Sequence, residues 1–360
     1  MTITDIATPA LLVDETLLDL NIREMAGYAE RHGKKLRPHA KAHKCLEIAK
    51  RQVAAGAVGV CVATVAEAEM LARGGIADLL LTSPVADTSK CERMAAVAKT
   101  GARVAVVVDH VEQVQLYATA ADEAGVQLDV LVDLDIGDHR TGVAPGGAAL
   151  ELAKVIVSHR DLSFKGLQAY SVKASHMSQQ EGRGEFSAKA LDQALHTKQL
   201  LENEGIESPE ITGGSTGSYF EDATLPYVTE LQAGSYPLMD VAYARIGVAA
   251  FRHALTVLTT VVSANQSDRV TVDAGFKALA TDRPFGPDVM YIPGARFGWA
   301  GDEFGYVFLD RTEHRVCLGD RLRLIPPHCD PNVNLYDRIY LCDGDEVKEV
   351  WSVMDRHHGS

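Results

Sequence analysis

Short apolar runs alternate with helical patterns over the first two thirds of the chain. A first run at 8–14 is followed by eight strand-like segments, at 36–42, 59–63, 78–81, 103–107, 128–133, 164–169, 210–213 and 230–234. Apolar residues at helical spacing occupy most of the intervals between them. Eight apolar strands alternating with helices predict a (β/α)8 TIM barrel, whose chemistry lies at the carboxyl ends of the strands. A doubly wound sheet is the alternative, but no GxGxxG sequence begins a helix.

The pattern changes near Tyr243–Val248. Helical spacing disappears there, and β-type runs separated by Gly and Pro turns follow, at 255–262, 270–273, 306–309, 321–325, 338–342 and 346–351. We therefore expect a barrel domain over residues 15–245. A mainly β domain is expected over 246–360, together with the strand within 1–14.

Composition and charge exclude several classes of function. The 360 residues are 46% hydrophobic, but no apolar run approaches the length of a membrane span. A formal net charge of −14 argues against a nucleic-acid partner, which requires a broad basic face. The first residues lack the basic and apolar regions of a secretory signal, and the six cysteines show no CxxC spacing. We expect a cytoplasmic protein with reduced thiols.

A basic cluster lies within the first predicted barrel strand, in the sequence RPHAKAHK at 37–44. Alternation in a strand would place Lys41 on one face with His39 and His43. Burial and neighbouring cations would then lower the lysine pKa and leave its amine able to form a Schiff base. The alternative is a solvated basic strand.

Two loops rich in Gly and Ser follow the last two predicted strands. They have the sequences TGGSTGS at 212–218 and QAGSY at 232–236. Glycines let backbone N–H groups approach an anion, hydroxyls add donors, and TIM barrels bind phosphate at these strands. A single such cluster is usually only a loop, but two of them on adjacent strands favour a phosphate site. The candidate ligands are Thr212, Gly214, Ser215, Thr216, Gly234, Ser235 and Tyr236.

Further polar residues follow the fifth and sixth strands. Arg140 lies in GDHRTGV, and an arginine facing a pyridine nitrogen would keep that nitrogen unprotonated. A surface ion pair is the alternative for this residue. Tyr170 and His176 come just after the sixth strand, where the imidazole is a candidate base, although most loop histidines have no catalytic role.

The β domain contains a candidate metal site in PPHCDPNVNL at 326–335. His328 and Asp330 would lie on one side of an extended segment and could chelate a divalent cation. An oxygen ligand suits Mn²⁺ or Mg²⁺, with Zn²⁺ as a further option. Cys329, on the other side of an extended segment, is not expected to be a ligand.

These motifs resemble those of the metal-activated, pyridoxal-phosphate (PLP)-dependent D-threonine aldolases and their D-serine dehydratase relatives, which have the alanine racemase-like fold. The resemblance covers nearly the whole chain. Its motifs are TPALLVD (8–14), RPHAKAHK (37–44), GDHRTGV (137–143), GLQAY (166–170), TGGSTGS (212–218), ELQAGSY (230–236), VDAGFK (272–277) and PPHCDPNVNL (326–335).

The resemblance implies a role for each candidate. Lys41 would carry PLP, and Arg140 would face the pyridine nitrogen. The ring and phosphate would be held by Tyr170, Thr216, Gly234 and Ser235, and the metal by His328 and Asp330. It also implies a small D-amino acid as substrate and a homodimer, in which the β domain of one subunit closes over the barrel of the other.

Asp330 favours an aldolase. In the family that the chain resembles, aldolases have His-x-Asp at the metal pair, whereas the dehydratases have His-x-Cys. The predicted reaction is retro-aldol cleavage of a D-3-hydroxy amino acid to glycine and an aldehyde, with His176 as the base. The alternative is a D-serine or D-3-hydroxyaspartate dehydratase, and a non-catalytic PLP carrier would lack the β domain. Ala63, Phe304 and the segment 171–173 depart from the typical aldolase motifs and bear on substrate choice.

Overall fold

The computed structural model describes residues 1–354 and 356. The chain forms two compact units. One, the barrel unit, comprises Met25–Lys41 and Leu46–Gly234; the other, the β unit, comprises Met1–Glu24, Ala42–Cys45 and the described part of Ser235–Arg356. The last segment of the β unit thus begins at Ser235, before the predicted boundary at residue 246. Residues 355 and 357–360 of the predicted β domain lie outside the described residues.

The barrel unit is built on an eight-stranded parallel sheet, in the order β2-β9-β8-β7-β6-β5-β4-β3. Its strands are β2 (Lys35–Leu36), β3 (Val60–Val62), β4 (Asp78–Leu81), β5 (Arg103–Val108), β6 (Leu128–Leu134), β7 (Leu162–Ala169), β8 (Glu210–Gly213) and β9 (Glu230–Leu231). Backbone hydrogen bonds from Cys61 to Pro38 (2.8 Å) and from Val58 to Leu36 (2.9 Å) join β3 to the segment around β2. They close the sheet, and the predicted (β/α)8 fold is confirmed.

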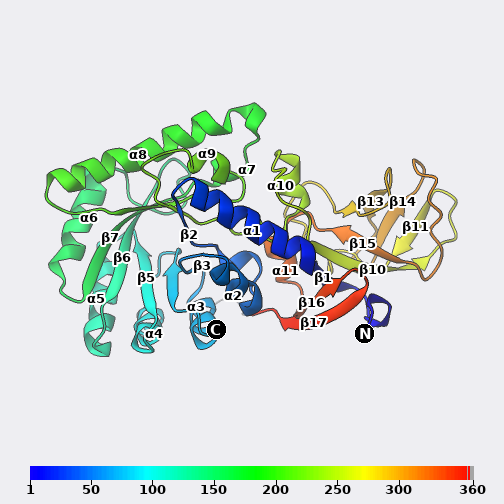
Figure 1. The fold of residues 1–360 in the computed structure, drawn as a ribbon, viewed down its shortest axis with the longest axis horizontal. Coiled ribbons are helices and arrows are strands. Elements are labelled where there is room, and N and C mark those ends of the chain that lie inside the picture. The colour runs from blue at the N-terminus through cyan, green and yellow to red at the C-terminus, as the bar shows by residue number, and fades with distance from the viewer. Residues whose placement is uncertain (355, 357–360) are drawn as a thin grey trace. The chain divides into compact units, whose positions relative to one another are not determined.

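Helices follow most of the strands and lie against the outside of the sheet (Figure 1). They are α2 (Leu46–Ala54), α3 (Val65–Arg73), α4 (Thr88–Lys99), α5 (Val111–Ala124), α6 (Gly147–Ser158), α7 (Val172–His176), η3 (Gln179–Glu181), α8 (Arg183–Asn203) and α9 (Tyr219–Asp222). The side chains of Thr64 and Asp87 accept hydrogen bonds from the first turns of α3 and α4, which fixes where these helices begin. Strands covered on both faces need near-continuous apolar sequence, as β5 shows with Val104–Val108 buried.

Buried charges cross the barrel interior near the beginnings of β4 and β9. Arg37 donates from Nε to Glu230 Oε2 at 3.0 Å and pairs through Nη1 with Asp78 at 2.5 Å. Thr212 donates from Oγ1 to the other oxygen of Glu230 at 2.8 Å. Burial raises the pKa of Glu230, while Arg37 acts in the opposite direction. The arginine therefore compensates a carboxylate that would otherwise be costly to bury.

The β unit is organised by a nine-stranded sheet. Its strands are β1 (Ala10–Asp14), β10 (Leu255–Ser263), β11 (Arg269–Val272), β12 (Asp288–Val289), β13 (Arg296–Trp299), β14 (Gly305–Phe308), β15 (Arg321–Ile325), β16 (Arg338–Asp343) and β17 (Glu346–Ser352). The short β12 and β13 were not predicted. The other elements of the β unit are η1 (Ile3–Asp5), α10 (Val241–Arg245) and α11 (Cys329–Val333). Two elements belong to both units: α1 (Glu15–Arg31) continues from the β unit into the barrel unit, and η2 (Ala40–Ala42) begins in the barrel unit and ends in the β unit.

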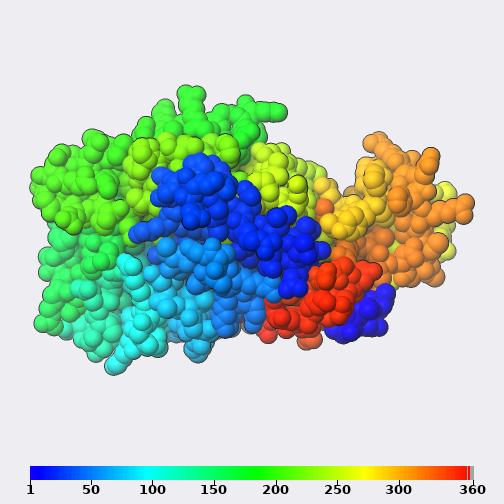
Figure 2. Space-filling model, viewed as in Figure 1, coloured from blue at the N-terminus to red at the C-terminus, as the bar shows by residue number. Residues whose placement is uncertain are grey.

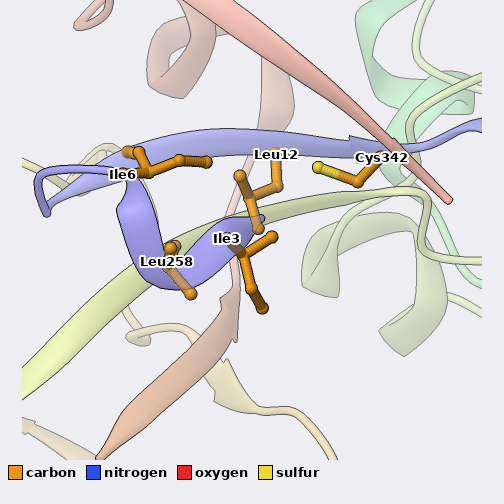
Figure 3. Close-up of a cluster of buried hydrophobic side chains, with 6 residues drawn as sticks. Ile3, Ile6, Leu12, Leu258 and Cys342 are labelled. Atoms are coloured by element: carbon orange, nitrogen blue, oxygen red, sulfur yellow. The ribbon is translucent and has the colours of Figure 1, made fainter. Parts of the chain in front are cut away.

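The first strand lies inside this sheet. β1 pairs antiparallel with β10 and parallel with β16, so that Leu11 faces Val257 on one side and Ile339 on the other. A buried cluster of Ile3, Ile6, Ala10, Leu12, Leu258 and Cys342 joins the amino-terminal segment to both neighbours (Figure 3). The space-filling view shows the first residues beside the last strands (Figure 2).

The predicted strand 36–42 is wrong at its carboxyl end. β2 stops at Leu36, and Ala40–Ala42 form a 3₁₀ turn, so Lys41 does not alternate along a strand with its neighbouring histidines. Within the described chain, no helix has both the length and the apolar character that crossing a membrane would require.

Candidate active site

Lys41 lies in the 3₁₀ turn, and its side chain is exposed. The burial on which a lowered pKa was predicted is therefore not observed. Its backbone N–H points to His39 Nδ1 at 3.4 Å, while His39 Nε2 lies 2.9 Å from Thr82 Oγ1. Because the Thr82 hydroxyl donates to Val62 O at 3.1 Å, it accepts from the histidine. His39 thus carries its proton on Nε2 and holds the Lys41 backbone with Nδ1.

Lys44, the other lysine of the cluster, has a different environment. Its side chain is buried, and Nζ donates to Asn334 Oδ1 at 2.9 Å within the β unit. His43 is also buried and accepts at Nδ1 from Cys45 N at 3.1 Å. The structure therefore separates the two lysines, and the exposed amine of Lys41 is the better candidate for a Schiff base.

The buried carboxylate of Asp222 accepts hydrogen bonds that fix the loop at 212–218. Ser218 donates from Oγ to Asp222 Oδ2 at 2.5 Å, and Ser187 donates to the other oxygen. Burial raises the pKa of Asp222 to about 6. Ser215 Oγ accepts from Gly217 N at 3.0 Å and from Ser218 N at 3.1 Å, which shapes the turn. The loop is thus built around its own hydroxyls, with Asp222 as its anchor.

Thr216 contributes the feature of this loop that best fits a phosphate. Its side chain is buried, and Oγ1 has no hydrogen-bond partner within the described part of the chain. Buried hydroxyls are normally satisfied, so this one is available to an anion. Gly214 has φ of +77°, and a Cβ there would lie 3.0 Å from Asp222 Oδ2, which explains the glycine. Thr212, by contrast, turns its hydroxyl to Glu230 in the barrel interior.

The second loop spans the boundary between the units. Gly234 is the last residue of its barrel-unit segment, and Ser235 and Tyr236 belong to the β unit. Ser235 donates from Oγ to Asp330 Oδ2 at 3.0 Å, so its hydroxyl contacts a predicted metal ligand. The Tyr236 ring is buried with its centre 5.6 Å from that of Phe251.

Arg140 and Tyr170 are brought together by β6 and β7. The guanidinium carbon of Arg140 lies 5.3 Å from the centre of the Tyr170 ring, a cation–π contact. Nearby, burial raises the pKa of Asp133, which accepts from Gln168 Nε2 at 2.8 Å and from Thr141 Oγ1 at 2.7 Å. The arginine and the phenol thus lie next to each other, beyond the carboxyl ends of β6 and β7.

His176 is the last residue of α7. Ser171 caps this helix by accepting from Ala174 N at 3.2 Å, and Asp138 accepts from Val172 N. Lys173 is exposed and donates from Nζ to Gly137 O at 2.8 Å, so it fastens the helix to the loop after β6. The residues that depart from the aldolase motif here form the start of the helix that carries His176.

The other two departures lie on separate elements. Ala63 follows β3 and donates its backbone N–H to Glu67 Oε2 at 2.7 Å. Phe304 precedes β14 in the β unit, where its side chain is 45% exposed. An exposed phenyl ring is available to contact a bound molecule, whereas a histidine at this position would add a polar group.

His328 and Asp330 come together, although the segment between them is not extended. His328 has extended backbone, but helix α11 begins at Cys329, and its third residue is Pro331, which a first helical turn tolerates. His328 Nε2 lies 3.7 Å from Asp330 Oδ2. Two ligands bound at about 2.1 Å to one ion lie about 3.0–3.5 Å apart, so the pair fits a divalent cation after a small shift.

Cys329 does not fit the role of a ligand. It is fully buried, and burial raises the pKa of its thiol, whereas a ligating cysteine must be a thiolate. Its backbone N–H donates to Asp240 Oδ2 at 2.8 Å, and its thiol lies 3.4 Å from Asp330 Oδ2. The described residues contain no group of three or more His, Cys, Asp or Glu side chains arranged to hold a metal.

Two carboxylates that support the pair were not predicted from the sequence. Asp240 anchors the start of α11, and Asp282 Oδ2 lies 2.7 Å from His328 Nδ1. Both are far from the PPHCDP motif in sequence, and neither belongs to a recognisable motif. Only the tertiary structure could reveal them.

The chain is similar to known proteins over nearly its whole length. Residues 13–240 match the family model for the N-terminal domain of alanine racemase, and residues 254–342 match that for a putative serine dehydratase domain. The 3-hydroxy-D-aspartate aldolase of Paracoccus denitrificans (strain Pd 1222) is 38% identical over 99% of this chain and 93% of its own length. A D-threonine aldolase of Arthrobacter sp is 38% identical over 97% of this chain and 92% of its own length.

A solved structure is similar over the same extent. The crystal structure of D-threonine aldolase from Filomicrobium marinum superimposes with a TM-score of 0.94 at 36% identity, covering 98% of this chain and 96% of that one. The resemblance found in the sequence motifs is therefore confirmed. The chain belongs to the D-threonine aldolase and D-serine dehydratase-like family of the alanine racemase-like fold.

Proposed function

We propose that this protein is a PLP- and divalent-metal-dependent aldolase that cleaves a D-3-hydroxy amino acid into glycine and an aldehyde. One observation carries the proposal: His328 and Asp330 form a histidine–carboxylate pair in a chain similar to two aldolases over nearly its whole length. The pair is supported by Ser235 and Asp282, as expected for a built site.

The barrel unit offers the groups that PLP requires. Lys41 would hold it through its amine, and Arg140 would face the ring nitrogen. Thr216 would donate to the phosphate its hydroxyl, which has no partner among the described residues. PLP would supply the electron sink for the negative charge left at Cα when the Cα–Cβ bond breaks. An arginine in that position keeps the nitrogen unprotonated and moderates the sink. Cleavage therefore depends on help from the hydroxyl side of the bond.

That help would come from the metal ligands and from His176. A divalent metal on His328 and Asp330 would make the substrate hydroxyl more acidic. His176 would take the hydroxyl proton as general base. The oxygen electrons would then form the carbonyl of the aldehyde, the Cα–Cβ electrons would remain at Cα, and a proton from solvent would be added there to give glycine. A dehydratase must expel the hydroxyl, so a base acting on it would oppose that reaction.

The other parts of the proposal concern the metal and the assembly. Asp330 supplies an oxygen ligand, which favours Mn²⁺ or Mg²⁺ over Zn²⁺. We also propose a homodimer with active sites at the interface, acting in the cytoplasm. Sedimentation of the PLP-loaded protein tests the dimer.

Product analysis tests the reaction. The PLP-loaded enzyme with Mn²⁺ is incubated with D-threonine, D-phenylserine, D-3-hydroxyaspartate and D-serine, with the L-enantiomers and Lys41→Ala as controls. We expect glycine and an aldehyde from at least one D-substrate and no turnover of any L-enantiomer. Ammonia and a 2-oxo acid as the main products would refute the aldolase and support the dehydratase.

A further inference from the structure

Asp282 lies in the loop between β11 and β12, and it contacts the imidazole of His328 on the edge away from Asp330. The Asp282 Oδ2 to His328 Nδ1 distance is 2.7 Å, whereas His328 Nε2 is the atom 3.7 Å from Asp330 Oδ2. The two carboxylates therefore lie at opposite edges of one ring. An ion bound at Nε2 could be shared with Asp330 but not with Asp282.

A second group competes for the same ring nitrogen. Arg283 Nη2 lies 3.4 Å from His328 Nδ1, and an arginine can only donate. Nδ1 cannot accept from the arginine and donate to the carboxylate at the same time. The carboxylate contact is shorter by 0.7 Å and pairs an N–H with a charged acceptor, so it prevails. Arg283 Nε lies 3.3 Å from Asp282 Oδ2 and so also supports the carboxylate.

This arrangement selects one form of the histidine. With its proton on Nδ1, the neutral imidazole has its lone pair on Nε2, the atom that faces Asp330. The other tautomer would place a proton between the two ligands and block the metal. A carboxylate behind a ligating histidine also fixes the ring plane and makes the imidazole a stronger ligand.

We propose that Asp282 is a positioning residue of the metal site, which sets the tautomer and orientation of His328 and thereby the affinity for the divalent cation. This inference rests on the assignment of His328 and Asp330 as ligands in the proposed function. It assigns no role in proton transfer to Asp282. The residue acts on the metal through the histidine.

Metal binding gives a readout independent of turnover. Free Mn²⁺ is measured by electron paramagnetic resonance during titration of the PLP-loaded wild type and of Asp282→Ala, Asp282→Asn and Asp282→Glu. The matched control is Asp288→Asn, which removes the same charge from an exposed aspartate of the β unit whose paired cation is Arg245 at 3.7 Å. We expect the Kd for Mn²⁺ to rise about 10- to 100-fold in Asp282→Ala. It should rise less in Asp282→Asn and Asp282→Glu, which keep an acceptor, and should be unchanged in the control.

Turnover then separates positioning from catalysis. At saturating Mn²⁺, kcat of the Asp282 variants should return close to that of the wild type, because both ligands remain. A wild-type Kd in both Asp282→Ala and Asp282→Asn, or an equal rise in the control, would overturn the inference while leaving the proposed function intact. Failure of the wild type itself to bind Mn²⁺ would instead overturn the metal part of the proposed function.

Discussion

The buried pair of Arg37 and Glu230 should be essential to the stability of the barrel unit. The side chains are 6% and 1% exposed, and their Nε–Oε2 distance is 3.0 Å. Replacing Arg37 by Met fills a similar volume but leaves the Glu230 carboxylate without its counter-charge. Removing one partner of a buried pair costs about 3–5 kcal/mol. For a unit of this size, 1 kcal/mol corresponds to roughly 2–4 °C in Tm, so Arg37→Met should lower Tm by roughly 6–20 °C.

The direction of the pH effect follows from the raised pKa of Glu230. A carboxyl group whose pKa is higher in the folded protein stabilises the fold at low pH, and this stability is lost as pH rises through the folded value. Without Arg37 the pKa of Glu230 rises further. The stability deficit of Arg37→Met should therefore be smaller at pH 5 than at pH 8.

Thermal and urea unfolding followed by circular dichroism measure this effect. Arg103 provides a matched control, since it is 52% exposed and lies 2.7 Å from Asp129. Arg103→Met should cost less than about 1 kcal/mol, as exposed ion pairs usually do. The double variant Arg37→Met, Glu230→Gln should recover much of the loss, because it removes the stranded charge of Glu230. The remaining carboxylate, Asp78, is 19% exposed and keeps Arg103 at 3.7 Å. A double variant as unstable as Arg37→Met would refute the reasoning, as would a loss below about 1 kcal/mol in Arg37→Met itself.

Four further outcomes are expected. Borohydride reduction followed by peptide mapping should place PLP on Lys41, and Lys41→Ala should be colourless; labelling of a different lysine would contradict this. Chelation, His328→Ala and Asp330→Ala should each abolish turnover without changing the PLP absorbance, whereas release of PLP would show that the two sites are not separable. Thr216→Val should weaken PLP binding by about 1.5–3 kcal/mol, roughly 10- to 150-fold by equilibrium dialysis, with Thr216→Ser close to the wild type. Burial raises the pKa of Asp222 from 3.8 to about 6, so the wild type should lose about 3 kcal/mol of unfolding free energy between pH 3.8 and pH 7. Asp222→Asn should not show this loss, and parallel pH profiles of the two proteins in urea unfolding would contradict the prediction.

The barrel could be predicted because its strands are short, apolar and bounded by turn residues. β4 and β8 begin and end at the predicted residues. The prediction failed at Lys41, where small and basic residues give no periodic signal and the chain turns into a 3₁₀ helix. It also missed β12, whose two residues are too few for alternation to be visible, and β13, where Gly298 weakens the strand pattern.

Residues of the candidate site could be proposed from the sequence only where they belong to sequence motifs. The pair of His328 and Asp330 was found from its spacing, although the expected extended backbone is replaced by the start of a helix. Asp282 and Asp222 were not predicted. Each contacts a residue of a motif but lies outside that motif, and the sequence around each aspartate shows no pattern of its own. Ser235 was predicted as a phosphate ligand, and its contact with Asp330 depends on tertiary packing between α11 and the chain after β9.

The position of β1 between β10 and β16 has a consequence for synthesis of the protein on the ribosome. β1 leaves the ribosome before β16, which follows about 320 residues later. At roughly 5–20 residues per second, the apolar residues Leu11–Val13 must wait roughly 16–65 s for their second neighbour. During that interval the barrel can form, since every one of its strands precedes the last part of the β unit. Until β16 emerges, the nascent chain therefore presents an apolar β1 with at least one unpaired edge, and molecular chaperones that bind short apolar segments are expected to engage it.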